Sequence, residues 1–374
     1  MVNKEIQIMQ VGIIGTGFGG FVHVPAFADC ASTNVAAIFS RSKSKAQKVA
    51  ERFQIDRVVA SYDEILKSPD IQIVSIATPP ATHHVIVMEA VKHGKHVVCE
   101  KPFAVNFAEA DAMYQVTRNA SLVNAIGHQM RFHPNHVTVK NILDGGDLGR
   151  IIQVNLSYST SNRIDATLPW DWRSDQNAGG GELNAMGSHQ IDLLRWWFGE
   201  VETVSGTLKT FIEKRKDPTH GELKAVTADD LVSFQLQFKS GALATAVVSS
   251  VAVGWKGFSV SIYGEMGALF IEGESQLTMF RRTTAVHDLS FKDPWLCKLW
   301  VAGSIWRASF GRLVENFVGA VSGLEHFKGA TFADGREVQR IIEAIRVSNR
   351  EGRRVGVGEV ENESANSVIA DVRM

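Results

Sequence analysis

The chain has 374 residues, enough for two or more domains at the usual size of about 150 residues each. Its 39 basic and 40 acidic residues give a formal net charge of −1, which excludes a general attraction to nucleic acid or to an anionic membrane. No apolar run approaches the roughly 20 residues that span a bilayer. The three cysteines, Cys30, Cys99 and Cys297, lie far apart without a Cys-x-x-Cys, which argues against a disulfide framework. The segment Met1–Met9 carries Lys4 and Glu5 and lacks the apolar core of a signal peptide, so we expect a cytoplasmic protein.

The first third of the chain alternates short apolar runs with longer amphipathic segments, as parallel strands joined by crossover helices do. We expect strands at Ile6–Ile14, Val35–Phe39, Ile71–Ala77, His96–Cys99 and Val123–Gly127. Helical spacing occurs in Phe21–Cys30, Ser44–Phe53, Thr82–Lys92, Phe107–Asn119 and His133–Leu143. This order predicts an α/β fold with a doubly wound parallel sheet, a Rossmann domain, in residues 1–130.

The pattern changes after Arg150, where polar and apolar residues alternate. Strands with one covered face are expected at Ile151–Tyr158, Thr203–Phe211, Asp230–Phe238, Ala242–Ser250 and Phe258–Tyr263. Lys239-Ser240-Gly241 is typical of a hairpin turn, and helices are expected at Gly181–Phe198, Arg312–Ser322 and Asp334–Arg350. The sequence therefore predicts an α+β domain with an antiparallel sheet over residues 131–357, followed by a polar tail at 358–374.

A glycine-rich motif, Gly15-Thr16-Gly17-Phe18-Gly19-Gly20, follows the first expected strand and precedes a helix. Gly15 would allow the tight turn, Gly17 would let the backbone approach a pyrophosphate, and Gly20 would let helix and strand pack closely. The helix N-terminus would offer N–H groups to the phosphates. A glycine-rich turn without a ligand is the alternative. The residues predicted to bind a dinucleotide here are Gly15, Thr16, Gly17, Phe18 and Gly20.

The second expected strand ends in Phe39-Ser40-Arg41, where dinucleotide-binding folds normally carry an acidic residue for the adenosine ribose. No carboxylate stands here to repel a 2′-phosphate, and Ser40, Arg41 and the nearby Lys45 could bind one. We expect NADP to be preferred, with NAD still possible. In the alternative interpretation Arg41 and the lysines are the solvated start of a helix.

Two further strand ends carry Thr78-Pro79-Pro80 and Glu100-Lys101-Pro102. Both fall at the carboxyl edge of the predicted sheet, where doubly wound folds bind their ligands. Pro102 disfavours helical geometry at Lys101. A lysine at this edge can face the reactive ring of a cofactor.

Four motifs now stand together: the glycine loop, Glu100-Lys101-Pro102, Met130-Arg131-Phe132-His133-Pro134, and Gly179-Gly180-Gly181 leading into Gly187-Ser188-His189. Together they resemble the glucose-fructose oxidoreductase, inositol dehydrogenase and rhizopine-catabolism (Gfo/Idh/MocA) family. The resemblance covers roughly residues 11–357. It implies an N-terminal Rossmann domain, a C-terminal domain with a large, mostly antiparallel sheet, and an NAD(P)-dependent oxidoreductase that acts on a sugar or polyol-like carbinol or ketone.

By this resemblance, Lys101 is the lysine that contacts the nicotinamide region and the reacting oxygen, and His189 is the catalytic histidine. Hydride leaves a carbinol carbon as the hydroxyl proton is removed, so the reaction needs an acid–base group and a cation beside the developing alkoxide. His189 suits the proton acceptor, and Lys101 suits the electrostatic partner or relay. The alternatives are a satisfied helix histidine and a surface lysine that packs along its stem.

The family positions beside the cofactor are occupied by Thr78, Pro79, His83, Glu100 and Arg173. Trp170 and Trp172 suit stacking on a sugar or nicotinamide and Arg173 could also hold substrate, with core packing as the alternative for the tryptophans.

Two residues are weaker substrate-site candidates. Arg131 is one, because an arginine near a domain junction often pairs structurally. Asp192, three residues after His189, is equally a group that orients the imidazole or a solvated helix charge.

One position departs from the family pattern. An aspartate commonly precedes the histidine by one helical turn, where this chain has Ala185. A residue at i−4 lies on the same helix face as His189, whereas Asn184 is about 100° around a regular helix. The missing carboxylate raises the alternative of a cofactor-binding regulatory or non-catalytic member.

A third alternative keeps the enzyme but changes its substrate to a non-carbohydrate ketone or diol. It depends on Trp295, Trp300 and Trp306 lining the pocket. We expect no metal site, because the histidines lack ligand spacing. The family resemblance also implies a homo-oligomer, formed through an exposed sheet face.

Overall fold

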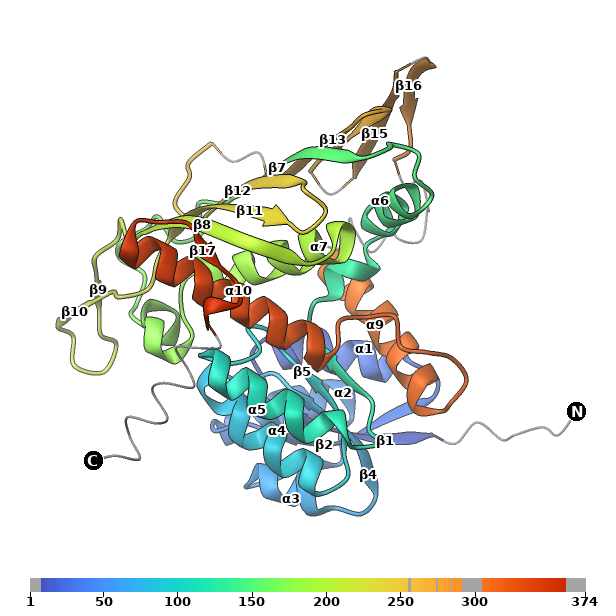
Figure 1. Ribbon diagram of the computed structural model, residues 1–374. Helices are drawn as coiled ribbons and strands as arrows, with labels where there is room; N and C mark the ends of the chain where they lie inside the picture. The colour runs from blue at the N-terminus through green and yellow to red at the C-terminus, as the bar shows by residue number, and fades with distance from the viewer. Residues whose placement is uncertain (1–7, 255–256, 274, 283, 291–304, 361–374) are drawn as a thin grey trace, which may run out of the picture. The chain divides into compact units, whose positions relative to one another are not determined.

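The computed structural model describes residues 8–254, 257–273, 275–282, 284–290 and 305–360 (Figure 1). Contacts divide them into two compact units. Unit 1 holds the described residues of Met1–Ala104, Glu109–Phe132 and Asp293–Gly335, and unit 2 those of Val105–Ala108, His133–Lys292 and Arg336–Met374. The prediction, with its boundary at residue 130, instead assigned residues 305–335 to the second domain. Cys297, Trp295, Trp300 and the tail from residue 361 lie outside the described residues.

Unit 1 contains a parallel six-stranded sheet in the order β3-β2-β1-β4-β5-β6. Its strands are β1 (Met9–Ile14), β2 (Thr33–Phe39), β3 (Arg57–Val58), β4 (Ile71–Ile76), β5 (His96–Cys99) and β6 (Asn124–Ile126). The run Ile73–Ile76 is buried throughout, as expected of a strand covered on both faces. The sheet confirms the predicted Rossmann fold.

The crossover segments of this sheet are helical. They are the π turn η1 (Gly19–His23), α1 (Val24–Asp29), α2 (Lys43–Phe53), α3 (Tyr62–Lys67), η2 (Pro80–Thr82), α4 (His83–Lys92) and α5 (Phe107–Arg118), and the short η3 (Gln129–Phe132) follows the last strand, β6. The short α3 was not predicted from the sequence. Ser61 and Glu64 form a capping box at its start, and this local signal could have identified it.

Helix α9 (Ile305–Val321) comes late in the chain but packs into the core of unit 1. Phe310, Leu313 and Phe317 are fully buried there, in one cluster with Ile13 and Val35. Burial of these large side chains explains why 305–335 belong with the Rossmann sheet rather than with the second sheet.

Unit 2 contains a nine-stranded sheet in the order β16-β15-β14-β13-β7-β12-β11-β8-β17. Its strands are β7 (Ile151–Ser159), β8 (Val201–Lys209), β11 (Leu231–Phe238), β12 (Leu243–Ser249), β13 (Gly257–Gly264), β14 (Gly267–Glu272), β15 (Gln276–Arg281), β16 (Thr284–Asp288) and β17 (Val355–Gly356). Strands β7 and β12 pair in parallel, and the other described pairs are antiparallel. The large, mostly antiparallel sheet is confirmed.

The remaining elements of unit 2 are mostly helical. They are α6 (Pro134–Asp144), η4 (Trp172–Ser174), η5 (Gln176–Ala178), η6 (Leu183–Gly187), α7 (Ser188–Phe198), α10 (Phe332–Glu351, which begins in unit 1) and the hairpin β9 (Lys214–Lys216) with β10 (Leu223–Ala225).

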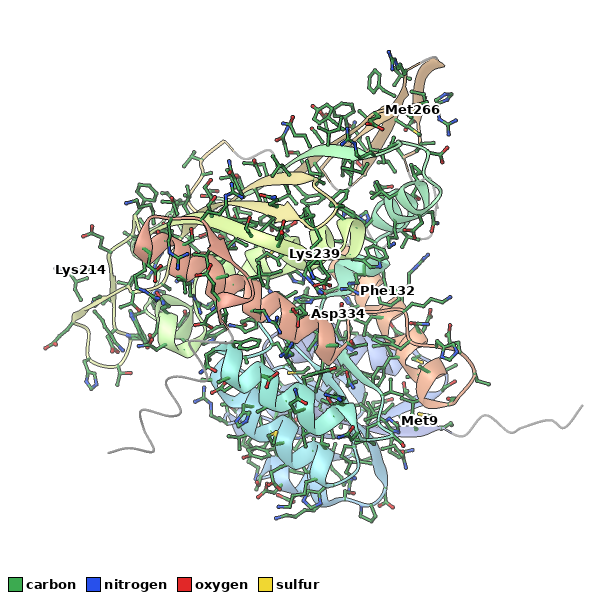
Figure 2. All side chains as sticks on the ribbon, viewed as in Figure 1. Met9, Phe132, Lys214, Lys239, Met266 and Asp334 are labelled. Atoms are coloured by element: carbon green, nitrogen blue, oxygen red, sulfur yellow. The ribbon has the colours of Figure 1, made fainter. Side chains whose placement is uncertain are left out.

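The predicted turn after β11 is confirmed. Lys239, labelled in Figure 2, lies in it, and Gly241 has φ +87°. The β13–β14 turn at Met266, also labelled there, was not predicted. Among the described residues, no helix combines the length and the apolar character needed to cross a membrane.

Asp229 ties the start of β11 to the glycine run before α7. Its Oδ2 accepts a hydrogen bond from the Leu183 backbone N–H at 2.8 Å, and a Cβ on Gly181 would lie 2.3 Å from its Oδ1. Burial raises the pKa of the Asp229 carboxyl to about 6, against the opposing effects of the Leu183 N–H and the charge of Arg346. The folded protein therefore binds this proton more tightly than the unfolded chain does.

We predict that Asp229→Asn flattens part of the pH dependence of stability. The contribution of Asp229 to the free energy of unfolding is fully present below about pH 4, its ordinary pKa, and is lost as pH rises through about 6, a loss of roughly 3 kcal/mol. Asparagine keeps an acceptor for Leu183 N–H without acquiring charge. In urea unfolding the variant should gain stability relative to the parent from pH 4.5 to 7.5. The exposed Asp56→Asn is the control, and a constant difference across this range would contradict the prediction.

Candidate active site

The glycine motif forms the turn between β1 and η1 in unit 1. Gly15 has φ +112°, and a Cβ there would lie 2.3 Å from the Ala77 carbonyl oxygen, so only glycine fits. At Gly17 a Cβ would meet nothing within 4 Å, so the backbone borders open space. A Cβ on Gly19 would lie 3.0 Å from the Ala77 side chain, while one on Gly20 would face Val49 of α2. Gly19, rather than Gly20, allows the close approach of helix to strand.

The residues predicted to bind a 2′-phosphate follow β2. The Ser40 hydroxyl accepts hydrogen bonds from Thr16 Oγ1 at 2.9 Å and from the Ser42 N–H at 3.3 Å, so it ties the glycine turn to the end of β2. Arg41 and Lys45 are exposed and form no ion pair with any residue that the structure describes. Two cationic side chains are therefore available beside this edge of the sheet.

His83 is fully buried at the start of α4. Its Nε2 lies 2.9 Å from the Thr78 carbonyl oxygen, and its Nδ1 lies 3.1 Å from that of Pro102. Burial lowers the pKa of the imidazole, against the effect of these carbonyl oxygens. Both ring nitrogens thus face backbone carbonyl oxygens, and a neutral imidazole, which carries one N–H, donates to one of the two.

Glu100 and Lys101 end β5 at the same edge. Lys101 is half-buried and precedes Pro102 in a cis peptide bond. The Glu100 carboxylate is buried: its Oε1 lies 3.0 Å from His23 Nε2, and its Oε2 accepts the Lys101 backbone N–H at 3.2 Å. His23 and Ser75, which complete this network, were not predicted from the sequence. A histidine on the apolar first crossover helix was the available signal.

Arg131 is buried in unit 1, and its Nη2 donates to Asp334 Oδ1 at 2.9 Å. Asp334 Oδ2 in turn accepts from the Thr331 N–H at the start of α10. This pairing matches the structural alternative for Arg131.

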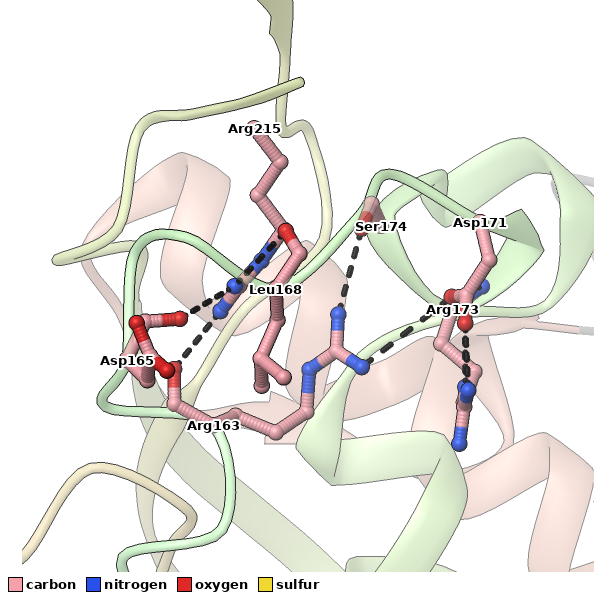
Figure 3. A network of polar contacts seen from close by, with 7 residues as sticks. All are labelled: Arg163, Asp165, Leu168, Asp171, Arg173, Ser174 and Arg215. Carbon is pink, nitrogen blue, oxygen red and sulfur yellow. Dashed lines mark hydrogen bonds and ion pairs between the residues drawn. The ribbon is translucent and has the colours of Figure 1, made fainter. Parts of the chain in front are cut away.

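Arg173 lies in a polar network of unit 2 (Figure 3). Its guanidinium pairs with Asp171, whose Oδ2 accepts from Arg173 Nε at 2.9 Å, while Arg163 Nη2 donates to Ser174 Oγ at 3.2 Å. Burial raises the pKa of Asp171, but its hydrogen bonds with Arg173 and the charges of both arginines outweigh burial and hold it below its ordinary value. More than half of the Arg173 side chain remains exposed, so it can still reach a ligand.

Trp170 packs against the β9–β10 hairpin. Its Nε1 donates to the Ala225 carbonyl oxygen at 3.0 Å, and Lys224 Nζ lies 3.3 Å from the centre of its ring. This placement favours packing for Trp170, with one ring face used by a cation–π contact. Trp172 begins η4 and is partly exposed.

His189 is buried near the start of α7, directly after the π turn η6. Hydrogen bonds in a π turn close over five residues rather than four. The position one turn before His189 therefore shifts from Ala185 toward Asn184. The angle of about 100° given above for Asn184 applies to a regular helix and not to this turn. Asn184 is fully buried, and its Nδ2 donates to the Gly180 carbonyl oxygen at 3.1 Å. An amide cannot supply the acid–base chemistry of the absent carboxylate.

Asp192 is fully buried in α7. Burial excludes the interpretation of a solvated helix charge. The other interpretation, a carboxylate that orients His189, stays a proposal.

A polar cavity of about 490 Å³ lies in unit 2, among side chains that include Gln176, Asp229, Glu343 and Arg346. None of the residues predicted from the sequence lines it. The candidate cofactor residues of unit 1 instead gather at the carboxyl ends of β1, β2, β4 and β5. These strand ends combine a glycine turn that borders open space, two exposed cationic side chains and a lysine at a strand end.

Comparisons with known proteins agree with this arrangement. Residues 9–128 match the model of an oxidoreductase family with an NAD-binding Rossmann fold, and residues 136–270 match the GFO/IDH/MocA C-terminal domain. An uncharacterised oxidoreductase of Synechocystis is 32% identical, over 71% of this chain and 72% of its own length. Levoglucosan dehydrogenase of Pseudarthrobacter phenanthrenivorans is 28% identical, over 72% of this chain and 75% of its own length.

A solved structure gives the same result for the fold. Levoglucosan dehydrogenase in complex with NADH and L-sorbose superposes with a TM-score of 0.87 at 27% identity, covering 94% of this chain and all of that one. With its two matching family models, its six-stranded parallel sheet and its nine-stranded second sheet, this chain belongs to the Gfo/Idh/MocA family of NAD-binding oxidoreductases.

Proposed function

We propose that this protein is an NADP(H)-preferring dehydrogenase or reductase that acts on a carbinol or ketone of a sugar or polyol-like substrate. The observation that carries the proposal is the common edge of three neighbouring strands. Gly15 contacts Ala77 after β4, and the Glu100 N–H donates to the Ile76 carbonyl oxygen, which places Lys101 beside this edge. A dinucleotide on the glycine turn would thus extend along an edge that ends in a lysine.

The cofactor, when bound, supplies or accepts the hydride. Thr16, Gly17 and Phe18 would hold its phosphates, and Thr78, Pro79 and the Lys101 turn would border its other end. Lys101 would stabilise the negative charge that develops on the reacting oxygen, and His189 would take or return the hydroxyl proton. Arg173 and Trp172 would contribute polar and stacking contacts to a hydroxylated ligand.

Similarity to levoglucosan dehydrogenase supports a sugar-like substrate. Levoglucosan dehydrogenase structures hold NADH together with L-sorbose or levoglucosan. A substrate panel for this protein should therefore begin with anhydrosugars, ketoses and cyclitols, and should include simple ketones and diols.

Replacing the lysine tests the reaction directly. We predict that Lys101→Ala lowers kcat about a hundredfold or more on the best substrate of that panel, because the developing oxyanion loses its cation. Lys101→Arg should recover part of the loss. The exposed Lys92→Ala is the matched control and should keep full turnover, measured by nicotinamide absorbance. Full turnover by Lys101→Ala would reject the proposed mechanism, and tight cofactor binding without turnover of any compound would favour a regulatory protein.

A preference for NADP(H) follows from the end of β2. Arg41 is exposed beside the Ser40 hydroxyl, and no carboxylate in Phe39-Ser40-Arg41 competes for it. A guanidinium is the donor that best matches a phosphate.

We predict that Arg41→Ala weakens NADPH binding about tenfold or more and changes NADH binding by less than about twofold. The variant loses a charge-assisted hydrogen bond to the 2′-phosphate, which contributes roughly 1.5–3 kcal/mol and which NADH cannot form. Titration of cofactor fluorescence measures both affinities. Lys48→Ala, an exposed change on the same helix α2, is the control. Tighter binding of NADH than NADPH by the unchanged protein would overturn the preference.

We also propose a homo-oligomer formed through the outer face of the nine-stranded sheet. Tyr263, Phe270 and Phe280 form a row across β13, β14 and β15, with ring centres 5.7 and 5.4 Å apart. Phe280 is 44% exposed, and Leu243 on β12 is 50% exposed. Apolar side chains gathered on one sheet face commonly mark a protein interface. A cytoplasmic location is proposed from the buried, unpaired Cys30 and Cys99.

The interface prediction is tested by charge. Phe280→Glu should shift the protein toward the monomer in sedimentation velocity, because a carboxylate in an apolar interface is costly to desolvate. Phe211→Glu places the same charge at a 61% exposed phenylalanine outside the aromatic row and should leave the assembly unchanged. A monomeric parent protein at micromolar concentration would contradict the proposal.

A further inference from the structure

Three polar side chains from three separate elements meet in the interior of unit 1. His23 Nδ1 lies 2.7 Å from Ser75 Oγ, and His23 Nε2 lies 3.0 Å from Glu100 Oε1. His23 and Ser75 are completely buried, and Glu100 is 6% exposed. A buried polar network of this kind is stable only where each of its groups is hydrogen-bonded, because an unpaired buried polar group destabilises the folded protein.

The network has the composition of a serine–histidine–acid triad, but it cannot act as one. A nucleophile must reach a substrate carbonyl, and the Ser75 hydroxyl is inaccessible within β4. A carboxylate at Glu100 requires His23 Nε2 to donate, so a neutral imidazole accepts at Nδ1 from Ser75 Oγ–H. The Ser75 hydroxyl then holds the His23 ring, and the His23 N–H points toward the Glu100 carboxylate.

The carboxylate is fixed on its other sides as well. Glu100 Oε2 accepts the backbone N–H of Lys101 at 3.2 Å, and a Cβ on Gly127 would lie 2.4 Å from Glu100 Oε1. The His23 ring stacks on Phe310 of α9, with 4.1 Å between ring centres and 24° between planes. Glycine at position 127 and an aromatic ring from a distant helix thus hold the pair in one arrangement.

We propose that His23 and Glu100 are positioning residues for Lys101, with Ser75 fixing the histidine. Their network orients the backbone of Lys101 and so sets where its ammonium group lies at the carboxyl edge of the sheet. This inference rests on the proposed role of Lys101 in the reaction. A displacement of about 1 Å in a catalytic group can cost on the order of a hundredfold in rate, so a fixed backbone at this point has a measurable effect.

The first test needs neither cofactor nor substrate. In His23→Phe the ring can still stack on Phe310, but both hydrogen bonds of the histidine are lost. The Lys101 amide should therefore exchange with deuterium about tenfold faster, measured in the peptide that contains residues 100 to 103. His23→Gln provides a second variant if the phenylalanine impairs folding. Glu100→Gln should exchange like the parent, since its amide oxygen accepts from Lys101 and its NH₂ can donate to the other histidine tautomer. Glu100→Ala should exchange faster.

The second test asks whether His23 acts through Lys101. We expect His23→Phe to lower kcat about ten- to a hundredfold, with KM and cofactor affinity changed less than about threefold. In the Lys101→Ala background the same change should lower kcat by less than about twofold, because the group being positioned is gone. The exposed His220→Phe is the matched control.

The outcomes separate this inference from the proposed function. Unchanged amide exchange in both His23 variants, or kcat losses that multiply in the double variant, would overturn the positioning role. Full turnover by Lys101→Ala alone would overturn the proposed function instead, whatever His23→Phe does to amide exchange. Faster exchange together with a loss that disappears in the Lys101→Ala background supports the inference.

Discussion

The carboxyl edge of the parallel sheet depends on one close approach, that of Gly15 to the end of β4. The left-handed backbone at Gly15 brings the glycine turn against the Ala77 carbonyl, a distance that no side chain at position 15 would permit. The turn can therefore lie directly over the strand ends. The loops after β2, β4 and β5 are then tied to it or to one another by Ser40, His83 and Glu100.

Buried polar groups hold this edge in place from below. His83 lies between carbonyl oxygens of the loops after β4 and β5, and His23 lies within hydrogen-bond distance of the Glu100 carboxylate, next to Lys101 in the chain. Each histidine is surrounded by protein, so its hydrogen bonds are stronger and their loss more costly than at the surface. The Rossmann edge therefore combines an exposed side, with Arg41 and Gly17, and an interior of buried polar groups.

Unit 2 achieves rigidity near His189 by different means. The glycine run before the helix is packed so tightly that a Cβ on Gly180 would lie 2.5 Å from the Arg173 carbonyl oxygen. Asp229 holds the next turn through the Leu183 N–H, although burial of its carboxyl lowers stability at neutral pH.

The sequence by itself determined the two sheet types, the glycine turn and the positions of Lys101 and His189 along the chain, because periodicity and short motifs are local properties. Local pattern could not show that α9 returns to the Rossmann core, since only the burial of Phe310 and Phe317 beside Ile13 decides this. It also could not show the π turn before His189 or the meeting of His23, Ser75 and Glu100. The meeting of these three side chains depends on contacts between residues up to 77 positions apart, which only the tertiary structure brings together.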